Sequence, residues 1–114
     1  MNHAMILIMA LNTFVGILLS GLSVPLIRRK VKPNPWYGFR VKATLNDERI
    51  WYSANEYAGK CLFWAGLAIA GSALTLFFVP GIGFVAYSLA CGGIAMVAVL
   101  VAAGCSFLFL RTIS

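Results

Sequence analysis

The stretch that decides the fold is residues 61–110, CLFWAGLAIAGSALTLFFVPGIGFVAYSLACGGIAMVAVLVAAGCSFLFL, which contains no charged side chain. As one helix it would be about 75 Å long, far more than the ~30 Å hydrocarbon core of a bilayer. Residues 79–83, VPGIG, interrupt the run with a proline and two glycines, which is typical of a tight turn. We therefore predict two membrane-spanning helices, at about 61–79 and 84–110.

A further apolar run precedes this stretch. Residues 4–27 would form a helix of roughly 36 Å, which is long enough to span a bilayer. Gly16 and Ser20 have the small-xxx-small spacing that permits close contact between membrane helices. The expected fold is therefore an all-α integral membrane domain over residues 1–114, with three transmembrane helices plus a short amphipathic cytoplasmic or interfacial helix.

The charged residues are crowded into residues 28–60, called here the basic segment. The chain is 61% hydrophobic and only 11% charged, whereas soluble domains carry roughly 25% charged residues. Outside the basic segment the only charged side chain is Arg111. Because Lys and Arg accumulate on the cytoplasmic side, we expect this segment and the C-terminus to face the cytoplasm and the N-terminus to lie outside. Anionic headgroups of the inner leaflet are the expected partners, and nucleic acid is not.

The basic segment has an irregular part and a helical part. Pro33-Asn34-Pro35 cannot lie inside a helix, and Gly38 permits a turn after it. Residues 46–60 have the pattern of a short amphipathic helix, capped by Asn46 or Thr44. Its predicted apolar face consists of Ile50, Ala54, Tyr57, Ala58 and Cys61. We expect Gly59 to provide a bend between this helix and the next span.

The residues of this segment also form a recognisable motif. In order along the chain they are Pro33, Asn34, Gly38, Phe39, Arg40, Thr44, Trp51, Asn55, Gly59 and Lys60. Over roughly residues 25–80 the chain resembles the SdpI family of bacterial membrane proteins. The resemblance implies a multi-pass protein of the bacterial plasma membrane that acts by binding, in toxin immunity or envelope signalling, as the family's founding member protects its producer from a secreted toxic protein.

Two roles remain open for the motif residues. Asn55 can bond the irregular backbone of residues 33–40, whose polar groups need partners near a bilayer. Arg40 can grip Asp47, Glu48, a lipid phosphate or a partner carboxylate. The favoured interpretation is that the motif folds the basic segment against the first two spans, with direct contact to a partner or lipid as the other role.

The sequence gives no sign of catalysis or of a cofactor. No expected span carries Asp, Glu, Lys or Arg in its middle, which disfavours ion-coupled transport. Cys61, Cys91 and Cys105 lie in apolar runs, and His3 is the only histidine, so a metal site is not expected. We therefore expect a non-enzymatic protein. The alternatives to a stand-alone binding protein are an accessory subunit of a larger membrane complex, a homo-oligomer and, disfavoured, a small transport component.

Overall fold

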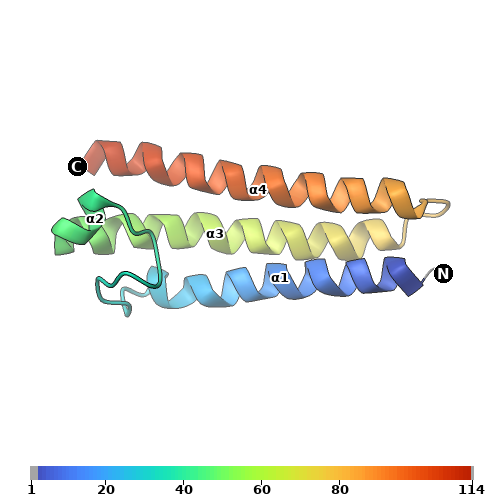
Figure 1. Cartoon of the computed structure of the whole chain (residues 1–114), viewed down its shortest axis with the longest axis horizontal. Coiled ribbons are helices and arrows are strands. Elements are labelled where there is room, and N and C mark those ends of the chain that lie inside the picture. Colours follow the sequence, from blue (N-terminus) through green and yellow to red (C-terminus); the bar gives the residue numbers. More distant parts are fainter. Residues whose placement is uncertain (1–2, 114) are drawn as a thin grey trace.

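The structure, a computed structural model, describes residues 3–113. That range forms four helices: α1 (His3–Ile27), α2 (Lys42–Asn46), α3 (Glu48–Phe77) and α4 (Phe84–Ile113). The helices α1, α3 and α4 lie side by side along the 51 Å axis of the molecule (Figure 1), and each is long and apolar enough to cross a bilayer. The all-α fold with three spans is thus confirmed, and α3 and α4 are separated at residues 78–83 as the proline and glycines predict.

The predicted helix at 46–60 and the predicted span at 61–79 are one continuous helix, α3, so the bend expected at Gly59 is wrong. Gly59 is buried where α3 meets α1, and a Cβ there would lie 3.1 Å from the carbonyl oxygen of Ser23. The glycine therefore serves close helix packing instead of a bend. The cap is also corrected: Asp47, not Asn46 or Thr44, caps α3 by accepting the N–H of Arg49 at 2.9 Å.

Small residues hold α1 against α3 through the middle of the bundle. A Cβ on Gly16 would lie 2.7 Å from the backbone nitrogen of Ala70, and one on Gly66 would lie 2.9 Å from the backbone nitrogen of Ser20. The hydroxyl of Ser20 donates to the carbonyl of Phe63 at 2.8 Å. The close contact predicted from the Gly16 and Ser20 spacing is therefore present, and its stability comes from van der Waals packing and one interhelical hydrogen bond.

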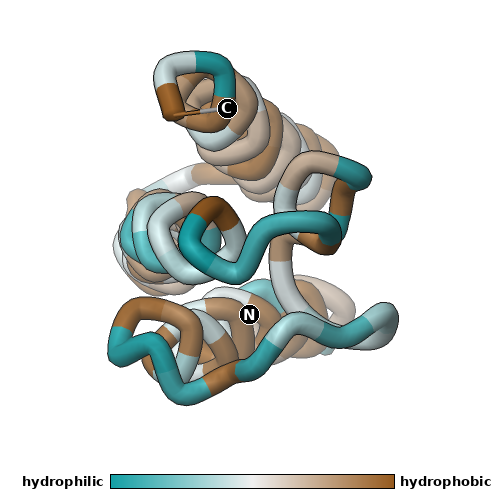
Figure 2. Tube along the Cα trace, turned by 90° about the vertical axis from the view of Figure 1, so that its left-hand side faces the viewer, coloured by the Kyte–Doolittle hydropathy of each residue, from teal (hydrophilic) through white to brown (hydrophobic). Residues whose placement is uncertain are grey.

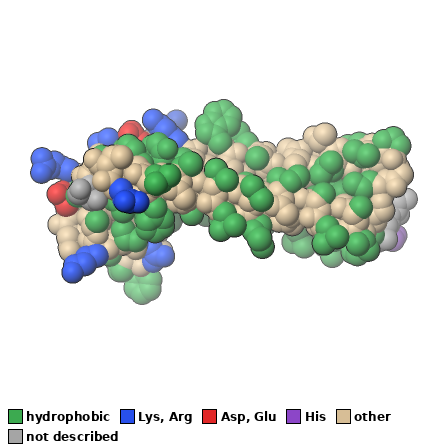
Figure 3. All heavy atoms as spheres, turned by 90° about the horizontal axis from the view of Figure 1, so that it is seen from above, with side chains coloured by type: hydrophobic (Ala, Val, Ile, Leu, Met, Phe, Trp, Pro, Cys, Tyr) green, Lys and Arg blue, Asp and Glu red, His purple; other side chains and the backbone are tan. Residues whose placement is uncertain are grey.

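The helix α3 lies between the other two, because α1 and α4 pack mainly against α3 and only a little against each other. Figure 2 shows this arrangement end-on, with the hydrophilic loop segments at the near end of the bundle. The loop between α1 and α3 and the C-terminal end of α4 share that end, while the start of α1 and the α3–α4 turn lie at the other (Figure 1). Lys and Arg side chains gather at the loop end, and apolar side chains cover much of the rest (Figure 3).

Candidate functional site

The motif loop, defined here as residues 28–47, is held by side chains from the first turns of α3. Asn55, only 1% exposed, accepts the backbone N–H of Phe39 with Oδ1 and donates through Nδ2 to the carbonyl oxygen of Phe39 at 3.3 Å. Its Nδ2 also donates to the carbonyl of Trp51 at 2.9 Å. The bond expected from Asn55 to the 33–40 backbone is therefore present, and the buried amide is fully satisfied.

Two other buried side chains fix the loop at points before and after Phe39. The indole N–H of Trp51, which is fully buried, donates to the carbonyl of Val31 at 2.8 Å. The hydroxyl of Thr44, also fully buried, accepts the N–H of Val41 at 2.9 Å and donates to the carbonyl of Phe39 at 2.8 Å. Since buried polar groups are costly unless paired, these bonds specify one loop conformation.

Gly38 is the one position in the motif loop that requires glycine for two reasons. Its φ of +108° lies in a region that other residues adopt at a cost. A Cβ there would also lie 2.7 Å from Oδ1 of Asn55 and 3.3 Å from the ring of Trp51. The backbone of Gly38 therefore packs directly against the side chains of Asn55 and Trp51, and no side chain fits between them.

The Pro33-Asn34-Pro35 stretch is ordered by the Asn34 side chain. Its Oδ1 accepts the backbone N–H groups of Trp36 at 2.9 Å and Tyr37 at 2.7 Å, and its Nδ2 donates to the carbonyl of Lys32 at 2.7 Å. This is the local Asx hydrogen bonding that replaces secondary structure in turns. The hydroxyl of Tyr37 then donates to the carbonyl of Leu22 in α1, and burial raises the pKa of that hydroxyl above its ordinary value.

Arg40 is exposed, and its guanidinium bonds the loop itself. It donates through Nε to the carbonyl of Gly38 at 3.3 Å and through one terminal nitrogen to the carbonyl of Pro35. Arg40 forms no ion pair with Asp47 or Glu48, two of the contacts considered for it. Oδ1 of Asp47 instead lies 4.0 Å from Nε of Arg49. Arg40 is therefore oriented by backbone carbonyls while it faces outward.

The structure brings six of the ten motif residues together around the Phe39 backbone, namely Gly38, Phe39, Arg40, Thr44, Trp51 and Asn55. Pro33 and Asn34 lie earlier in the motif loop, where the Asn34 side chain bonds the backbone of Lys32, Trp36 and Tyr37. Gly59 lies farther along α3 in the contact with α1, and Lys60 is an exposed side chain next to it. The sequence motif thus has two parts. The side chains of Thr44, Trp51 and Asn55, which hold the loop around Phe39, are called the clamp from here on, and Gly59 forms a separate helix contact.

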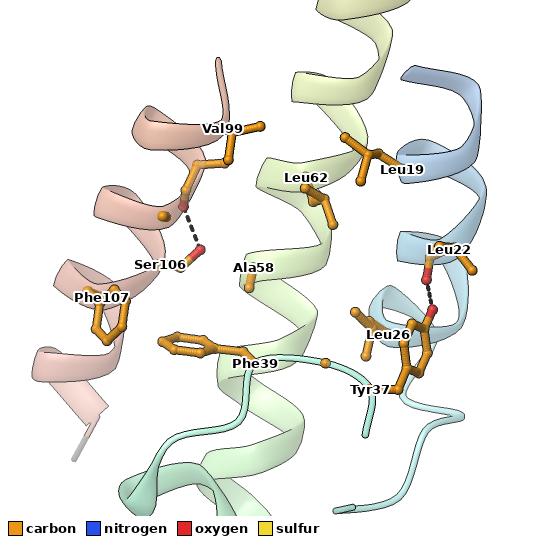
Figure 4. Close-up of a pocket in the computed structure, with 13 residues that line it drawn as sticks. Leu19, Leu22, Leu26, Tyr37, Phe39, Ala58, Leu62, Val99, Ser106 and Phe107 are labelled. Atoms are coloured by element: carbon orange, nitrogen blue, oxygen red, sulfur yellow. Dashed lines mark hydrogen bonds between the residues drawn. The ribbon is translucent and has the colours of Figure 1, made fainter. Parts of the chain in front are cut away.

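Sequence reasoning missed an apolar cavity of about 340 Å³ beside this clamp. Figure 4 shows Leu22 and Leu26 of α1, Leu62 of α3, and Val99 and Phe107 of α4 around it, with Tyr37 and Phe39 of the motif loop at its end. The rings of Phe39 and Phe107 meet edge to face with centroids 4.9 Å apart. Only the tertiary placement of α1 and α4 creates this space, so no local pattern in the sequence indicates it.

Within residues 3–113 the structure groups no three His, Cys, Asp or Glu side chains as metal ligands would be grouped. The available chemistry of the site is that of a basic, hydrogen-bonded loop beside an apolar cavity. Charge-assisted hydrogen bonds and apolar contacts are the interactions that such a surface offers to a ligand.

Comparison with known families agrees with the motif. The model of the SdpI/YfhL protein family matches residues 30–110, which include the whole clamp around Phe39, all of α3 and α4 as far as Leu110. The chain belongs to this family. The family assignment and the three apolar helices together make it a multi-pass membrane protein.

The similarity to a curated family member is local. The uncharacterised protein YfhL of Bacillus subtilis (strain 168) is 40% identical over 43 residues, which are 38% of this chain. The alignment spans only 39% of the length of YfhL, about two fifths of that relative. No solved structure matches the chain.

Proposed function

We propose that this SdpI-family chain acts by binding, without catalysis, in toxin immunity or envelope signalling. The observation that carries the proposal is that the buried side chains of the motif hold the loop in place, whereas Trp36 and Arg40 stay exposed. Asn55, Thr44 and Trp51 are buried, and their polar groups form hydrogen bonds with the backbone of the loop. The ring of Trp36, 85% exposed, and the guanidinium of Arg40 stand outward on the frame so made.

Exposed aromatic and arginine side chains on a rigid frame are typical of recognition surfaces. Tryptophan and arginine dominate the binding energy of many protein interfaces, and little ordering entropy is lost when the frame is already fixed. Lys32 and Lys42 are exposed on the same loop and add positive charge. This composition favours a partner with acidic groups, or the headgroups of anionic lipids.

The orientation that we propose places the motif loop and the C-terminus in the cytoplasm and the N-terminus outside, in the bacterial plasma membrane. The support is the charge asymmetry, since eight of the nine Lys and Arg residues precede residue 61 at the loop end. The test uses single cysteines, in a cysteine-free variant, at Lys42 and at Gly83. An impermeant thiol reagent added to intact cells should modify only the cysteine at position 83, and modification at position 42 alone would reverse the topology.

The immunity role is tested by deletion and complementation. We expect cells that lack the protein to be more sensitive to toxins secreted by sibling strains, and wild-type protein to restore resistance. Trp36→Ala should fail to restore resistance although the protein accumulates normally, because this exposed ring contributes nothing to the clamp. Trp64→Ala, which removes another exposed tryptophan ring from α3 outside the motif loop, is the matched control. Unchanged sensitivity of the deletion strain would remove the immunity proposal.

An accessory subunit of a larger membrane complex is the second candidate. The observation that favours it is on α4, where a Cβ on Gly92, Gly93 or Gly104 would meet nothing within 4 Å. Open glycines on a membrane helix are suited to close contact with another helix. Purification in mild detergent followed by mass analysis of the intact complex distinguishes the candidates, because stoichiometric copurification with a large assembly would exclude a stand-alone protein.

A further inference from the structure

The cavity beside the clamp runs along the helices. Its α1 wall extends from Leu19 to Leu26, a rise of about 10 Å at ~1.5 Å per residue. Its α4 wall extends from Val99 to Phe107, and α3 contributes Leu62 between the two walls. The cavity exists because α1 and α4 both pack on α3 and barely on each other. It is therefore an elongated space parallel to the helix axes.

The walls of the cavity are apolar even where polar side chains line it. The hydroxyl of Ser106 donates to the carbonyl of Ala102 at 2.6 Å, and the hydroxyl of Tyr37 donates to the carbonyl of Leu22. Both hydrogen bonds are drawn in Figure 4, and they turn the hydroxyl groups toward the helix backbones. A hydrocarbon occupant would thus meet carbon atoms and no unpaired donor.

At the loop end of the cavity lies the guanidinium of Arg40, which has N–H groups that are not used within the part of the chain that the structure describes. Residues 37–39 cross from α1 toward α4 at this end, and Gly38, which lines the cavity, accepts a hydrogen bond from Nε of Arg40. The bonds to Gly38 and Pro35 use two of the five N–H groups of the guanidinium, so three remain. Neither ion pair found within residues 3–113 involves Arg40.

We propose that the cavity holds one acyl chain of an anionic phospholipid whose phosphate binds Arg40. A guanidinium matches the geometry of a phosphate, and the oriented side chain loses little entropy on binding. A transmembrane helix is the poorer occupant, because it would cover the apolar walls without supplying a phosphate to the Arg40 guanidinium at the loop end. This inference goes beyond the proposed function, since it needs no toxin and no protein partner.

The test uses native mass spectrometry of the purified full-length protein, titrated in detergent with phosphatidylglycerol or phosphatidylcholine. We expect one phosphatidylglycerol to bind in preference to phosphatidylcholine. Arg40→Gln should weaken phosphatidylglycerol binding about ten-fold, as loss of a charge-assisted contact implies. Arg111→Gln, which removes an exposed charge at the same end of the bundle but outside the motif loop, should leave the affinity unchanged. Equal losses in the two variants would show general headgroup attraction and overturn the site.

Filling the cavity separates an internal chain from lipid bound on the outside. Ala103→Phe places a ring in the cavity from an exposed position of α4, whereas Ala86→Phe makes the same change on α4 outside it. We expect only Ala103→Phe to abolish the bound lipid. Leu22→Trp, which fills the cavity from α1, replaces the first variant if Ala103→Phe does not fold, and it should also abolish the bound lipid. Retained lipid in a folded filled variant, or a second protein chain displaced by filling, would overturn the proposal.

Discussion

Asn55 pairs with both backbone polar groups of Phe39, although the two residues are 16 positions apart in the sequence. Phe39 is thereby presented to α4, where its ring meets that of Phe107. This one contact ties the motif loop to α3 by hydrogen bonds and to α4 by aromatic packing. Its loss should therefore affect the whole loop end of the bundle.

Asn55→Leu should lower the free energy of unfolding by about 1–3 kcal/mol, because the N–H of Phe39 loses its buried acceptor. Thermal unfolding of the purified protein in detergent measures the effect. Ser53→Ala, on the same helix at a half-buried position outside the clamp, is the control and should change little. Equal stability of the Asn55→Leu and wild-type proteins would contradict the clamp.

Gly38→Ala should destabilise the protein more than Gly81→Ala does. Both glycines have positive φ, +108° and +78°, so both substitutions strain the backbone by roughly 1 kcal/mol or more. Only at position 38 would the new Cβ also strike Asn55, whereas the space around Gly81 is open. Comparison of the two unfolding temperatures isolates the steric contribution, and equal losses would mean that the loop yields without cost.

Gly16→Ala should destabilise the α1–α3 contact by about 1–3 kcal/mol, as overpacking of a close interface does. The matched control is Gly21→Ala on the same helix, where a Cβ meets nothing within 4 Å and alanine is the better helix former. We expect the control to be as stable as wild type or slightly more so. A Gly16→Ala protein that unfolds no earlier than the Gly21→Ala protein would refute the close contact.

Tyr37 should give the motif loop a dependence on alkaline pH. Burial raises the pKa of its hydroxyl above the ordinary value of 10.0, so the stability that it contributes is complete below pH 10 and is lost as the pH rises through the higher folded pKa. The difference in tyrosinate absorbance between the wild-type and Tyr37→Phe proteins measures this pKa. A midpoint at or below 10 would show that the side chain is solvated and not held against Leu22.

Much of the fold can be predicted from local composition and residue spacing. The uncharged run at 61–110 requires two spans, Pro80 and the two glycines that follow it predict the turn between them, and Gly16 indicates a close helix contact. These features depend on local composition or on helical spacing, both of which can be read directly from the chain.

The errors came where one residue type serves two purposes. Glycine permits bends and close contacts alike, so Gly59 was assigned a bend when it packs against Ser23. The buried face of the helix at 46–60 was predicted from apolar residues, yet Trp51, Asn55 and Gly59 are buried there and Ile50 is only half-buried. Asn55 is turned inward because the motif loop supplies polar backbone groups for it, a tertiary fact that periodicity does not contain.

The absence of a break in α3 has a mechanical consequence. From Glu48 to Phe77 the helix extends about 45 Å, so the residues that clamp the motif loop and the residues that pack on Tyr87 belong to one stiff rod. A force applied to the loop has no hinge in α3 to absorb it. Anything that tilts the loop end of α3 must also displace Ala73 and its hydrogen bond from Tyr87 near the other end of the bundle.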